Sequence, residues 1–373
     1  KTCQITKEPF EILPQERKIL EHFNIPEPDI CFTERLKRRL AFYNRRHIYK
    51  RTCDATGKKI ISIISPNKPY KVYQKDYWWS DEWDPMDYGR DYDFSRPFFE
   101  QFNDLRLQVP TLNLVQYGNI ENSTYTNDIL RSKDCYMIFD GESATHCMYG
   151  ETFLNTHHCI EFFCLVNCEH CYEVTHCNNC YNLRFSEFCE SCSDSYFLRD
   201  CKSCKNCFGC TNLNHKQYYI FNKPHTKEQY EKFINSLNFR NYNELQNYKE
   251  KFIEFEKSQP YKAQRGHQNE NVIGDNVNNS KDSLNCFDCD SIRDCAHCTD
   301  VLVGANDCVD IHVWGDQMNH CYNCMVVGDQ VENVMCSSLI AFGASNIFYS
   351  YECSRGVHNL FGCIGLRKKE YCI

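Results

Sequence analysis

The stretch that decides the fold, residues 147–210, reads CMYGETFLNTHHCIEFFCLVNCEHCYEVTHCNNCYNLRFSEFCESCSDSYFLRDCKSCKNCFGC. Its cysteines recur at the spacing i to i+21, in the series Cys147–Cys168–Cys189–Cys210, Cys159–Cys180–Cys201 and Cys171–Cys192. A fixed period in the twenties is typical of a solenoid, and the frequent Tyr, Phe, Cys and Thr residues favour strands. We therefore predict a β-solenoid (β-helix) with coils of about 21 residues.

A second cysteine-rich lobe follows at a looser spacing, with Cys286, Cys298, Cys308 and Cys321 at successive intervals of 12, 10 and 13. Residues 206–220 and 359–373 are identical at eight of 15 positions, which indicates an internal duplication. We predict a mainly-β chain with two such lobes of about five coils each. The expected divisions are an α+β module at 1–115, a first solenoid lobe at 116–222, a helical spacer and loop at 223–270, and a second solenoid lobe at 271–373.

The spacer is rich in Glu and Lys and has apolar residues at helical spacing, with Thr226 as its N-cap. We expect its helix to cover a solenoid end or to join the lobes, because open solenoid ends expose strand edges. Residues 264–283 are polar and contain two glycines, so we predict a loop there.

Two roles compete for the cysteines. Eight CxxC pairs are present, and four of their cysteines have the spacing of a four-thiolate zinc site, namely Cys168, Cys171, Cys189 and Cys192. The alternative is a stacked thiol core, because the repeats align these cysteines with Ile and Leu and place polar residues inside the CxxC pairs. We favour the thiol core without a cofactor. Zinc is the second possibility and disulfides are the third.

Six His-Cys dipeptides suggest a catalytic pair, but adjacent side chains in a strand point to opposite faces. If each cysteine faces inward, its histidine faces solvent and the two groups cannot form a dyad. The sequence also lacks GxSxG, P-loop, GxGxxG and HExxH motifs. We therefore predict that the chain is not an enzyme and has no small-molecule substrate.

The N-terminal part, up to residue 115, carries the segments TCQIT (2–6), DICFTE (29–34) and TCDATGKK (52–59). Each resembles a zinc-ribbon knuckle that has lost its second cysteine, with Thr6, Glu34 and Thr56 in its place. Since three single thiols do not complete a four-ligand site, we predict a small module without zinc.

Residues 35–51 are strongly basic, and Leu36, Leu40 and Tyr43 recur at helical spacing after Thr33, the expected N-cap. An amphipathic basic helix of this kind could contact RNA phosphates. It could equally be a solvated face that pairs with the acidic stretch 76–93. The candidate RNA-binding residues are Arg35, Lys37, Arg38, Arg39, Arg45, Arg46, Lys50 and Arg51.

The acidic stretch also holds Trp78, Trp79 and Trp83 among tyrosines. These rings could form a stacking platform for a sugar or a base. We favour an aromatic wedge that docks the N-terminal module onto a solenoid end.

Several longer segments resemble a cysteine-rich repeat family of bacteria of the candidate phyla radiation (Patescibacteria). These segments are the pattern CDATGKxIISIxSP that ends at Pro66, the stretch DYWWSDEWDPMDYGRDYDFSRPFFEQF that ends at Phe102, and the run from SKDCY at 132 to IFNKPHTKEQY at 230. The resemblance implies a bacterial, cytoplasmic protein and implies no activity.

Composition limits the function further. The net charge of −8 argues against a generally basic nucleic-acid binder. No apolar run reaches the roughly 18 residues of a membrane span, and we expect no secretion leader. We predict a structural or protein-binding scaffold that contacts a protein partner or itself and not a membrane. The alternatives are an RNA- or ribosome-associated protein and a thiolate metal-binding protein.

Overall fold

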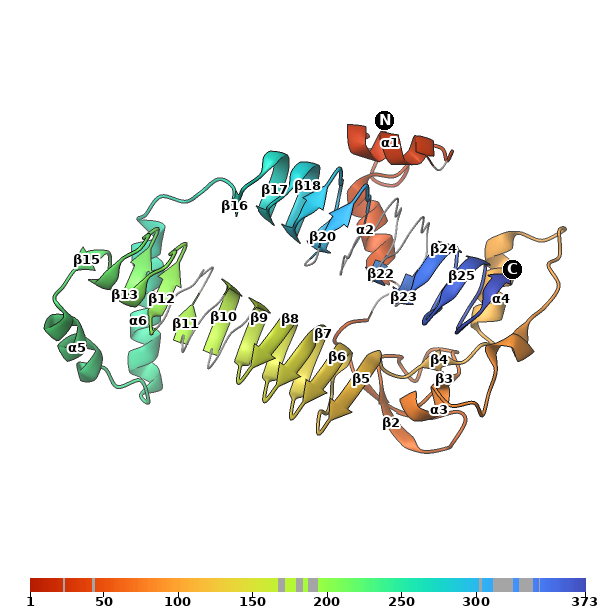
Figure 1. Cartoon of the computed structure of the whole chain (residues 1–373), viewed down its shortest axis with the longest axis horizontal. Coiled ribbons are helices and arrows are strands. Elements are labelled where there is room, and N and C mark those ends of the chain that lie inside the picture. Colours follow the sequence, from red (N-terminus) through yellow and green to blue (C-terminus); the bar gives the residue numbers. More distant parts are fainter. Residues whose placement is uncertain are drawn as a thin grey trace.

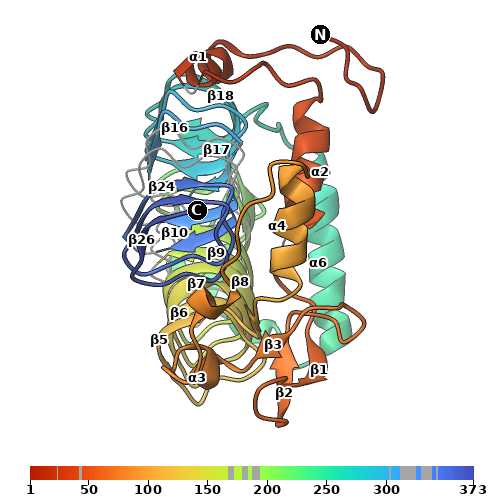
Figure 2. The same cartoon turned by 90° about the vertical axis from the view of Figure 1, so that its right-hand side faces the viewer.

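The structure is a computed structural model of the chain. It describes residues 1–22, 24–41, 44–166, 172–178, 184–186, 194–301, 304–310, 325–328, 338–341 and 343–373. Strand predominates over helix, which confirms the mainly-β prediction. Two rows of short strands lie side by side and run in opposite directions (Figure 1). Helices α2, α4 and α6 lie on one face of these rows (Figure 2).

Residues 1–115 mix helices with short strands. The helices are α1 (Pro14–His22), α2 (Phe32–Ala41), α3 (Lys75–Trp78), the 3-10 helix η1 (Pro85–Tyr88) and α4 (Phe98–Arg106). The strands are β1 (Tyr49–Thr52), β2 (Lys59–Ser62), β3 (Val72–Tyr73) and β4 (Thr111–Leu112). Strands β1 and β2 pair antiparallel, and β3 and β4 pair parallel. We call residues 1–115 the N-terminal module.

The first row of strands, here called the first ladder, runs from β5 to β14. Its strands are β5 (Gln116–Glu121), β6 (Asn127–Lys133), β7 (Tyr136–Thr145), β8 (Met148–His157), β9 (Ile160–Val166), β10 (Tyr172–Asn178), β11 (Arg184–Ser186), β12 (Tyr196–Arg199), β13 (Lys205–Thr211) and β14 (Gln217–Ile220). Each strand pairs parallel with the next one along the chain.

The register of the first ladder corrects the predicted coil length. Tyr136 pairs with Met148, Met148 with Ile160, and Ile160 with Tyr172. Successive strands therefore pair at the offset i to i+12, and not at the predicted i to i+21. The repeat between paired strands is thus shorter than the predicted 21 residues.

Every third side chain faces the interior, which explains why the sequence suggested the longer period. Cys135, Ile138, Ala144 and Cys147 are buried and lie at multiples of three from one another. Because 21 is a multiple of three, cysteines at the spacing i to i+21 all face the interior. They do not stand above one another in paired strands, because that requires the spacing i to i+12. The stacked column is Cys135–Cys147–Cys159, at the spacing i to i+12.

The backbone turns at the residue before each inward one. Asp134, His146 and His158 have φ angles of 54°, 55° and 56°, and every third residue from Asn122 to Glu161 has a positive φ. Asn, Asp and His tolerate this left-handed conformation better than most residues. The frequent Asp-Cys, Asn-Cys and His-Cys dipeptides therefore mark turns of the coil.

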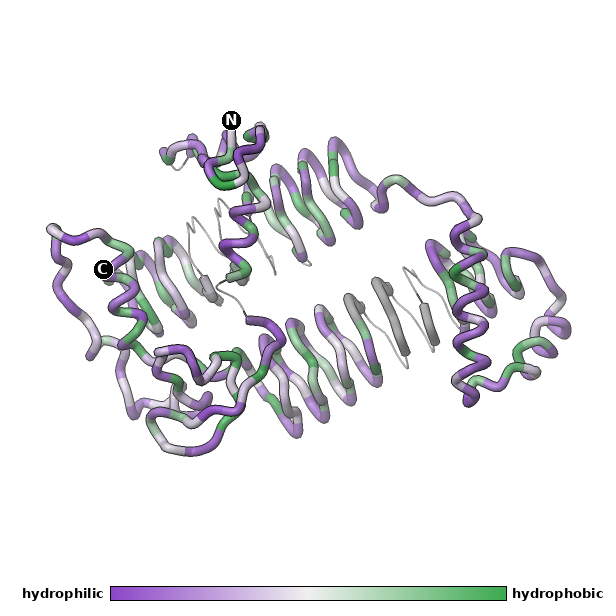
Figure 3. The backbone as a smooth tube through the Cα atoms, turned by 180° about the vertical axis from the view of Figure 1, so that it is seen from behind, coloured by the Kyte–Doolittle hydropathy of each residue, from purple (hydrophilic) through white to green (hydrophobic). Residues whose placement is uncertain are grey.

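The inward positions are matched between neighbouring coils. Gly150 lies beneath Phe162 of the next coil, and a Cβ atom at Gly150 would come within 2.2 Å of that ring. The small residue Gly150 thus leaves the space that the large side chain of Phe162 fills. Figure 3 shows the alternation of hydrophobic and hydrophilic residues along each coil.

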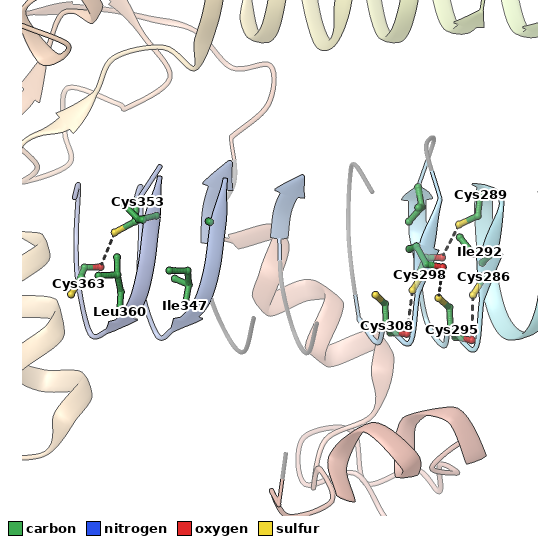
Figure 4. Close-up of a cluster of buried hydrophobic side chains, with 14 of the residues drawn as sticks. Cys286, Cys289, Ile292, Cys295, Cys298, Cys308, Ile347, Cys353, Leu360 and Cys363 are labelled. Carbon is green, nitrogen blue, oxygen red and sulfur yellow. Dashed lines mark hydrogen bonds between the residues drawn. The ribbon is translucent and has the colours of Figure 1, made fainter. Parts of the chain in front are cut away.

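The second ladder repeats this pattern at an offset of 12 or 13 between paired strands, except that Gly266 pairs with Val277 and Glu270 with Lys281 at an offset of 11. Its strands are β16 (Gly266–His267), β17 (Glu270–Asn278), β18 (Lys281–Asp290), β19 (Ile292–Arg293), β20 (Thr299–Val301), β21 (Ala305–Asn306), β22 (Met325–Gly328), β23 (Ser338–Ala341), β24 (Ala344–Phe348), β25 (Val357–Phe361) and β26 (Glu370–Cys372). Phe287 pairs with Thr299 at the shorter offset, and Ala344 pairs with Val357 at the longer one. The interior is lined by cysteines and aliphatic residues (Figure 4).

Between the ladders lie β15 (Lys223–Pro224), α5 (Lys227–Ser236) and α6 (Tyr242–Lys257). The predicted N-cap is confirmed, because the Thr226 hydroxyl accepts from the Gln229 N–H in a capping box. Aromatic residues of both helices pack on Phe197 and Phe208 of the first ladder. The loop predicted at 264–283 is wrong, since β16, β17 and the start of β18 lie there; their outward-facing polar residues imitate a loop in the sequence.

Candidate functional site

The thiols of the inward cysteines are hydrogen-bonded. The Sγ of Cys201 lies 3.4 Å from the carbonyl oxygen of Arg199 and 3.5 Å from that of Cys210. Most described inward cysteines share this arrangement, with one carbonyl two residues before and another nine or ten residues after. Figure 4 shows it for Cys286, Cys295 and Cys353. The S–H group can thus donate inside the coil or to the next one.

The sulfur atoms also accept hydrogen bonds from the next coil. The N–H of Asn222 donates to the Sγ of Cys210 over 3.5 Å, and the N–H of Cys147 donates to the Sγ of Cys135. Serine takes the same role at Ser195, whose Oγ accepts from the N–H of Cys207. A buried N–H without a partner costs about 1–3 kcal/mol. Cysteine therefore does more than fill apolar space, because it satisfies a backbone donor of the adjacent coil.

Burial keeps the thiols of Cys353 and Cys363 protonated. It raises the pKa of Cys363 to about 12 and raises the pKa of Cys353 further. Both values are far above neutral pH, and the thiolate is the nucleophile and metal ligand. Cys353 and Cys363 are therefore unreactive core groups. By contrast, hydrogen bonds from neighbouring thiols lower the pKa of Cys204 and Cys210. Burial opposes ionisation of Cys295, but hydrogen bonds from neighbouring thiols outweigh it and lower its pKa.

The CxxC pairs place both cysteines inward where the structure describes them. The pairs 201–204, 207–210, 286–289 and 295–298 are buried at both positions. In the predicted thiol ladder, Cys147, Cys159, Cys201 and Cys210 are buried, whereas Cys168, Cys180 and Cys189 lie outside the described residues. The proposed zinc quartet Cys168, Cys171, Cys189 and Cys192 also lies outside them. Within the described ranges, no three Cys, His, Asp or Glu side chains are grouped closely enough to hold a metal ion.

The His-Cys dipeptides have two different outcomes. His146 is half-exposed beside buried Cys147, as predicted. His297 was also expected at the surface but is buried, because the N-terminal module covers it. Its ring stacks on Phe32 at a centroid distance of 4.4 Å, and its Nε2 lies 3.4 Å from the Glu16 carboxylate.

In two N-terminal knuckles, the cysteine sulfur accepts a hydrogen bond from a distant backbone N–H. The Sγ of Cys3 accepts from the backbone N–H of Cys31 over 3.4 Å, and the Sγ of Cys53 accepts from that of Gln74 over 3.3 Å. Burial opposes ionisation of Cys3, but hydrogen bonds from Thr6 and from backbone N–H groups outweigh it and lower its pKa to about 6. In each turn, hydrogen-bond donors of the kind that stabilise a metal-bound thiolate instead donate to the sulfur of one cysteine.

The basic segment is buried at its first residues. Arg35 donates to Glu16 over 2.6 Å and to Asp310 over 2.5 Å, and all three side chains are buried. Arg39, one turn later, lies 3.1 Å from Asp310. Leu40, which was expected on the buried face, is 44% exposed. Arg35 and Arg39 are thus buried in place of Leu40, because the surface that the helix covers is acidic. Leu36 is half-buried, and Tyr43 lies outside the described residues.

The predicted extent of this helix is also wrong. Helix α2 spans Phe32–Ala41, so Thr33 lies inside it and is not an N-cap, and β1 begins at Tyr49. The remaining basic residues have other partners. Arg45 lies 3.2 Å from Asp140 of the first ladder and 3.8 Å from Asp300 of the second.

The outer basic residues complete this description. Arg46 pairs with Glu151, and Arg51 donates to the carbonyls of Ser65 and Tyr70. Lys37 pairs with Glu34 and is exposed, as are Arg38 and Lys50. The acids that face this segment therefore come from the ladders and α1, and not from the stretch 76–93 that was expected to pair with it.

The tryptophan cluster packs against both ladders. Trp79 contacts Tyr117 of β5 at a ring distance of 6.0 Å, and the Arg355 guanidinium lies 3.9 Å from the Trp79 ring centre. Arg367, near the last strand of the second ladder, donates to the Trp78 carbonyl over 2.6 Å. The expected aromatic wedge therefore lies where the first ladder begins and the last strands of the second ladder pass.

A buried carboxyl group lies at each contact of the N-terminal module with a ladder. Glu352 of the second ladder accepts from the Thr111 hydroxyl and from the Leu112 N–H. Burial raises the pKa of Glu352 to about 7. Burial likewise raises the pKa of Asp140 to about 7, although the nearby Arg45 opposes the shift.

The residues that hold the N-terminal module against the two ladders were not identified from the sequence. Asp140, Asp300, His297 and Asp310 all have positive φ angles and follow the three-residue turn pattern. The signal was an Asp, Asn or His directly before an inward residue, repeated every three positions.

Neither a comparison with protein-family models nor a search of curated proteins finds a match to this chain. Among the described helices, none has the length and apolar character needed to cross a membrane.

Proposed function

We propose that this chain is a non-catalytic interaction scaffold in which the two ladders are β-solenoids with short coils, held in one frame by the N-terminal module. The observation that carries the proposal is Arg45, which joins Asp140 of one ladder to Asp300 of the other. Such a frame offers long, regular faces to a protein partner or to a second copy.

The interior supports this role. The described cysteines are free thiols, and those lining the ladders are buried and hydrogen-bonded across neighbouring coils. Their use as coil-forming residues fits a bacterial cytoplasm, where thiols stay reduced. The N-terminal resemblance to zinc ribbons fits a module that kept the fold of a metal site and replaced the metal with internal hydrogen bonds.

The RNA-binding alternative has less support from the geometry. Arg35, Arg39 and Arg45 are engaged with carboxylates inside the frame. The exposed cations of residues 35–51 are Lys37 and Arg46, which pair with Glu34 and Glu151, and Arg38 and Lys50. Fluorescence anisotropy with a single-stranded RNA 20-mer at low salt separates the two functions. The scaffold function predicts that Arg38→Glu and Lys50→Glu leave the signal unchanged, whereas a salt-dependent loss of binding would favour RNA.

Hydrogen exchange tests the frame itself. In Arg45→Met, we expect faster exchange in both β7 and β20, because Asp140 and Asp300 lose a shared cation. The matched control is Arg46→Met, whose side chain pairs with Glu151 at the surface. Faster exchange in one ladder alone would show that Arg45 does not join the two, and would contradict the proposed frame.

A further inference from the structure

The first ladder has an exposed apolar face that the frame leaves uncovered. Tyr136, Met148 and Ile160 each follow an inward cysteine and stand above one another in paired strands. Met148 is 42% exposed and Ile160 is 43% exposed. Contiguous exposed apolar side chains of this kind mark an interaction surface.

A second column widens this face. Tyr125 and Tyr149 contact Tyr136 edge-on, at ring distances of 5.6 Å and 5.7 Å, and Tyr149 is 51% exposed. These rings are held by one another and by the rigid coils, so a partner would lose little side-chain entropy on binding. We call these two columns the tyrosine face.

A polar column precedes the same inward cysteines. Asn122 donates to Asp134 over 3.0 Å, His146 lies 3.7 Å from Asp134, and the rings of His146 and His158 stack at 4.9 Å. The column therefore has hydrogen-bond acceptors toward one end and imidazole rings toward the other. It lies two residues from the tyrosine face, so the Cα atoms are within about 7 Å.

We infer that a second copy of this chain binds the tyrosine face through a two-fold axis that passes between the coils of Asp134 and His146. Such an axis is perpendicular to the ladder and therefore reverses the order of the coils in the second copy. It sets Asp134 opposite the partner's His146, and Asn122 opposite the partner's His158. It also sets Tyr136 against the partner's Met148. Two copies of this polar column are thus complementary only when they run in opposite directions. This favours a second copy of the chain over an unrelated partner.

This inference rests on the proposed scaffold function and names its partner. RNA is disfavoured on this face because the column carries Asp134, with Glu161 beside Ile160, and the chain has a net charge of −8.

Sedimentation equilibrium of the whole chain tests the inference. We expect a dimer that Tyr149→Ser and Ile160→Ser each weaken at least about tenfold in Kd, as central apolar contacts do. The matched control is Ile273→Ser on β17 of the other ladder, where Ile273 is 65% exposed; it should change Kd by less than about twofold. A monomer at about 100 µM wild-type chain, or equal effects of all three variants, would overturn the inference.

A charge exchange tests the two-fold geometry independently of the apolar contacts. His146→Asp alone sets two carboxylates against each other across the axis, and Asp134→His alone sets two imidazoles against each other. Both should weaken the dimer, and the double variant should restore it because the complementary pair is rebuilt. Failure of the restoration would contradict the proposed axis.

Hydrogen exchange on the same samples separates this inference from the proposed function. A monomer with protected ladders would refute self-association and leave the scaffold intact. A chain with unprotected ladders would refute the scaffold itself.

Discussion

The two ladders end on the same duplicated motif, yet different parts of the chain cover them. Phe208 and Phe361 hold equivalent places in the duplicated segments. Phe208 is fully buried by the segment that follows it, with Phe233 of α5 at 5.0 Å and Tyr248 of α6 at 5.4 Å. Phe361 is 40% exposed and packs on Phe98 of α4, a helix from the distant N-terminal module, at 5.3 Å.

The glycine after each phenylalanine shows that the two covers are alternatives. Both Gly209 and Gly362 have positive φ angles. A Cβ atom at Gly209 would meet the Phe221 ring, and a Cβ atom at Gly362 would meet the Phe98 ring. The space beside each glycine is thus filled by an aromatic ring. In the first ladder the ring belongs to the segment that follows directly, and in the second ladder it belongs to the N-terminal module. The first ladder should therefore resist unfolding by itself, and the second should depend on the N-terminal module.

The largest expected effect comes from breaking the link between the module and the second ladder. Arg35→Met leaves the buried carboxylates of Glu16 and Asp310 without their shared cation. We expect a loss of about 3–5 kcal/mol in the free energy of unfolding. In hydrogen exchange, residues 295–310 should lose protection while residues 136–162 keep theirs.

Exposed Arg38 provides the control, since Arg38→Met should change the free energy of unfolding by less than about 0.5 kcal/mol. Equal loss of protection in both ladders would show that the first ladder also depends on the module.

The two phenylalanines sharpen the comparison directly. Phe208→Ala should cost about 3 kcal/mol, because it removes a buried ring and leaves a cavity beneath α5 and α6. Phe361→Ala should cost about 1 kcal/mol, because that ring is already partly hydrated. Urea denaturation measures both values, and equal costs would mean that local and remote covers stabilise their ladders alike.

The interiors should behave identically even though the covers differ. The Oγ of Ser195 accepts from the Cys207 N–H, and that of Ser283 accepts from the Cys295 N–H. The sulfurs of Cys207 and Cys295 accept in turn from Tyr219 and Cys308. Replacement of either cysteine by Val leaves that N–H unpaired and should cost about 2 kcal/mol, whereas replacement by Ser should cost less than about 1 kcal/mol.

Thermal denaturation of the two Val variants and the two Ser variants measures which replacement costs more stability in each ladder. If Val were better tolerated than Ser in either ladder, the cysteines there would act as apolar filler and not as hydrogen-bond acceptors.

The effect that is smallest per pH unit compares the contacts of the N-terminal module with the two ladders. The folded pKa values of Glu352 and Asp140 are both about 7, above the ordinary carboxyl value of about 4. The folded state therefore holds more protons than the unfolded state between about pH 4 and pH 7, and stability falls as pH rises through this window. Glu352→Gln and Asp140→Asn should each flatten that fall by at most about 1.4 kcal/mol per pH unit.

The measurement is the free energy of unfolding of each variant between pH 4.5 and pH 7.5. A slope identical to that of the wild type would show that the carboxyl group is already ionised in the folded state.

The orientation of the cysteines could be predicted from the sequence, but the length of the coil could not. Cysteines that alternate with Ile and Leu indicate inward positions whichever coil length holds. Because inward positions recur every three residues, periods of 12 and 21 residues are equally compatible with inward cysteines. The turn residues before the cysteines held the information that distinguishes the two periods. His146 and His158 were considered as members of His-Cys pairs and not as left-handed turns, and Asp134 was not singled out.

Helix α2 shows why the junction could not be predicted. Sequence periodicity identifies an apolar face, and it placed Leu40 inside. The true partner surface is a column of turn residues that includes Asp310, far from Arg35 along the chain. The buried face of α2 was therefore set by an acidic surface that local sequence does not reveal.

Site-resolved alkylation of the native protein tests the central claim most directly. Mass spectrometry would follow the labelling rate of each cysteine, together with the metal content of the same sample. We predict that partly exposed Cys31 and Cys372 react first, and that inward cysteines such as Cys147, Cys207 and Cys295 react only on global unfolding, with all 28 thiols free and no bound metal. Rapid labelling of these inward cysteines, or their protection by a stoichiometric metal ion, would contradict the account.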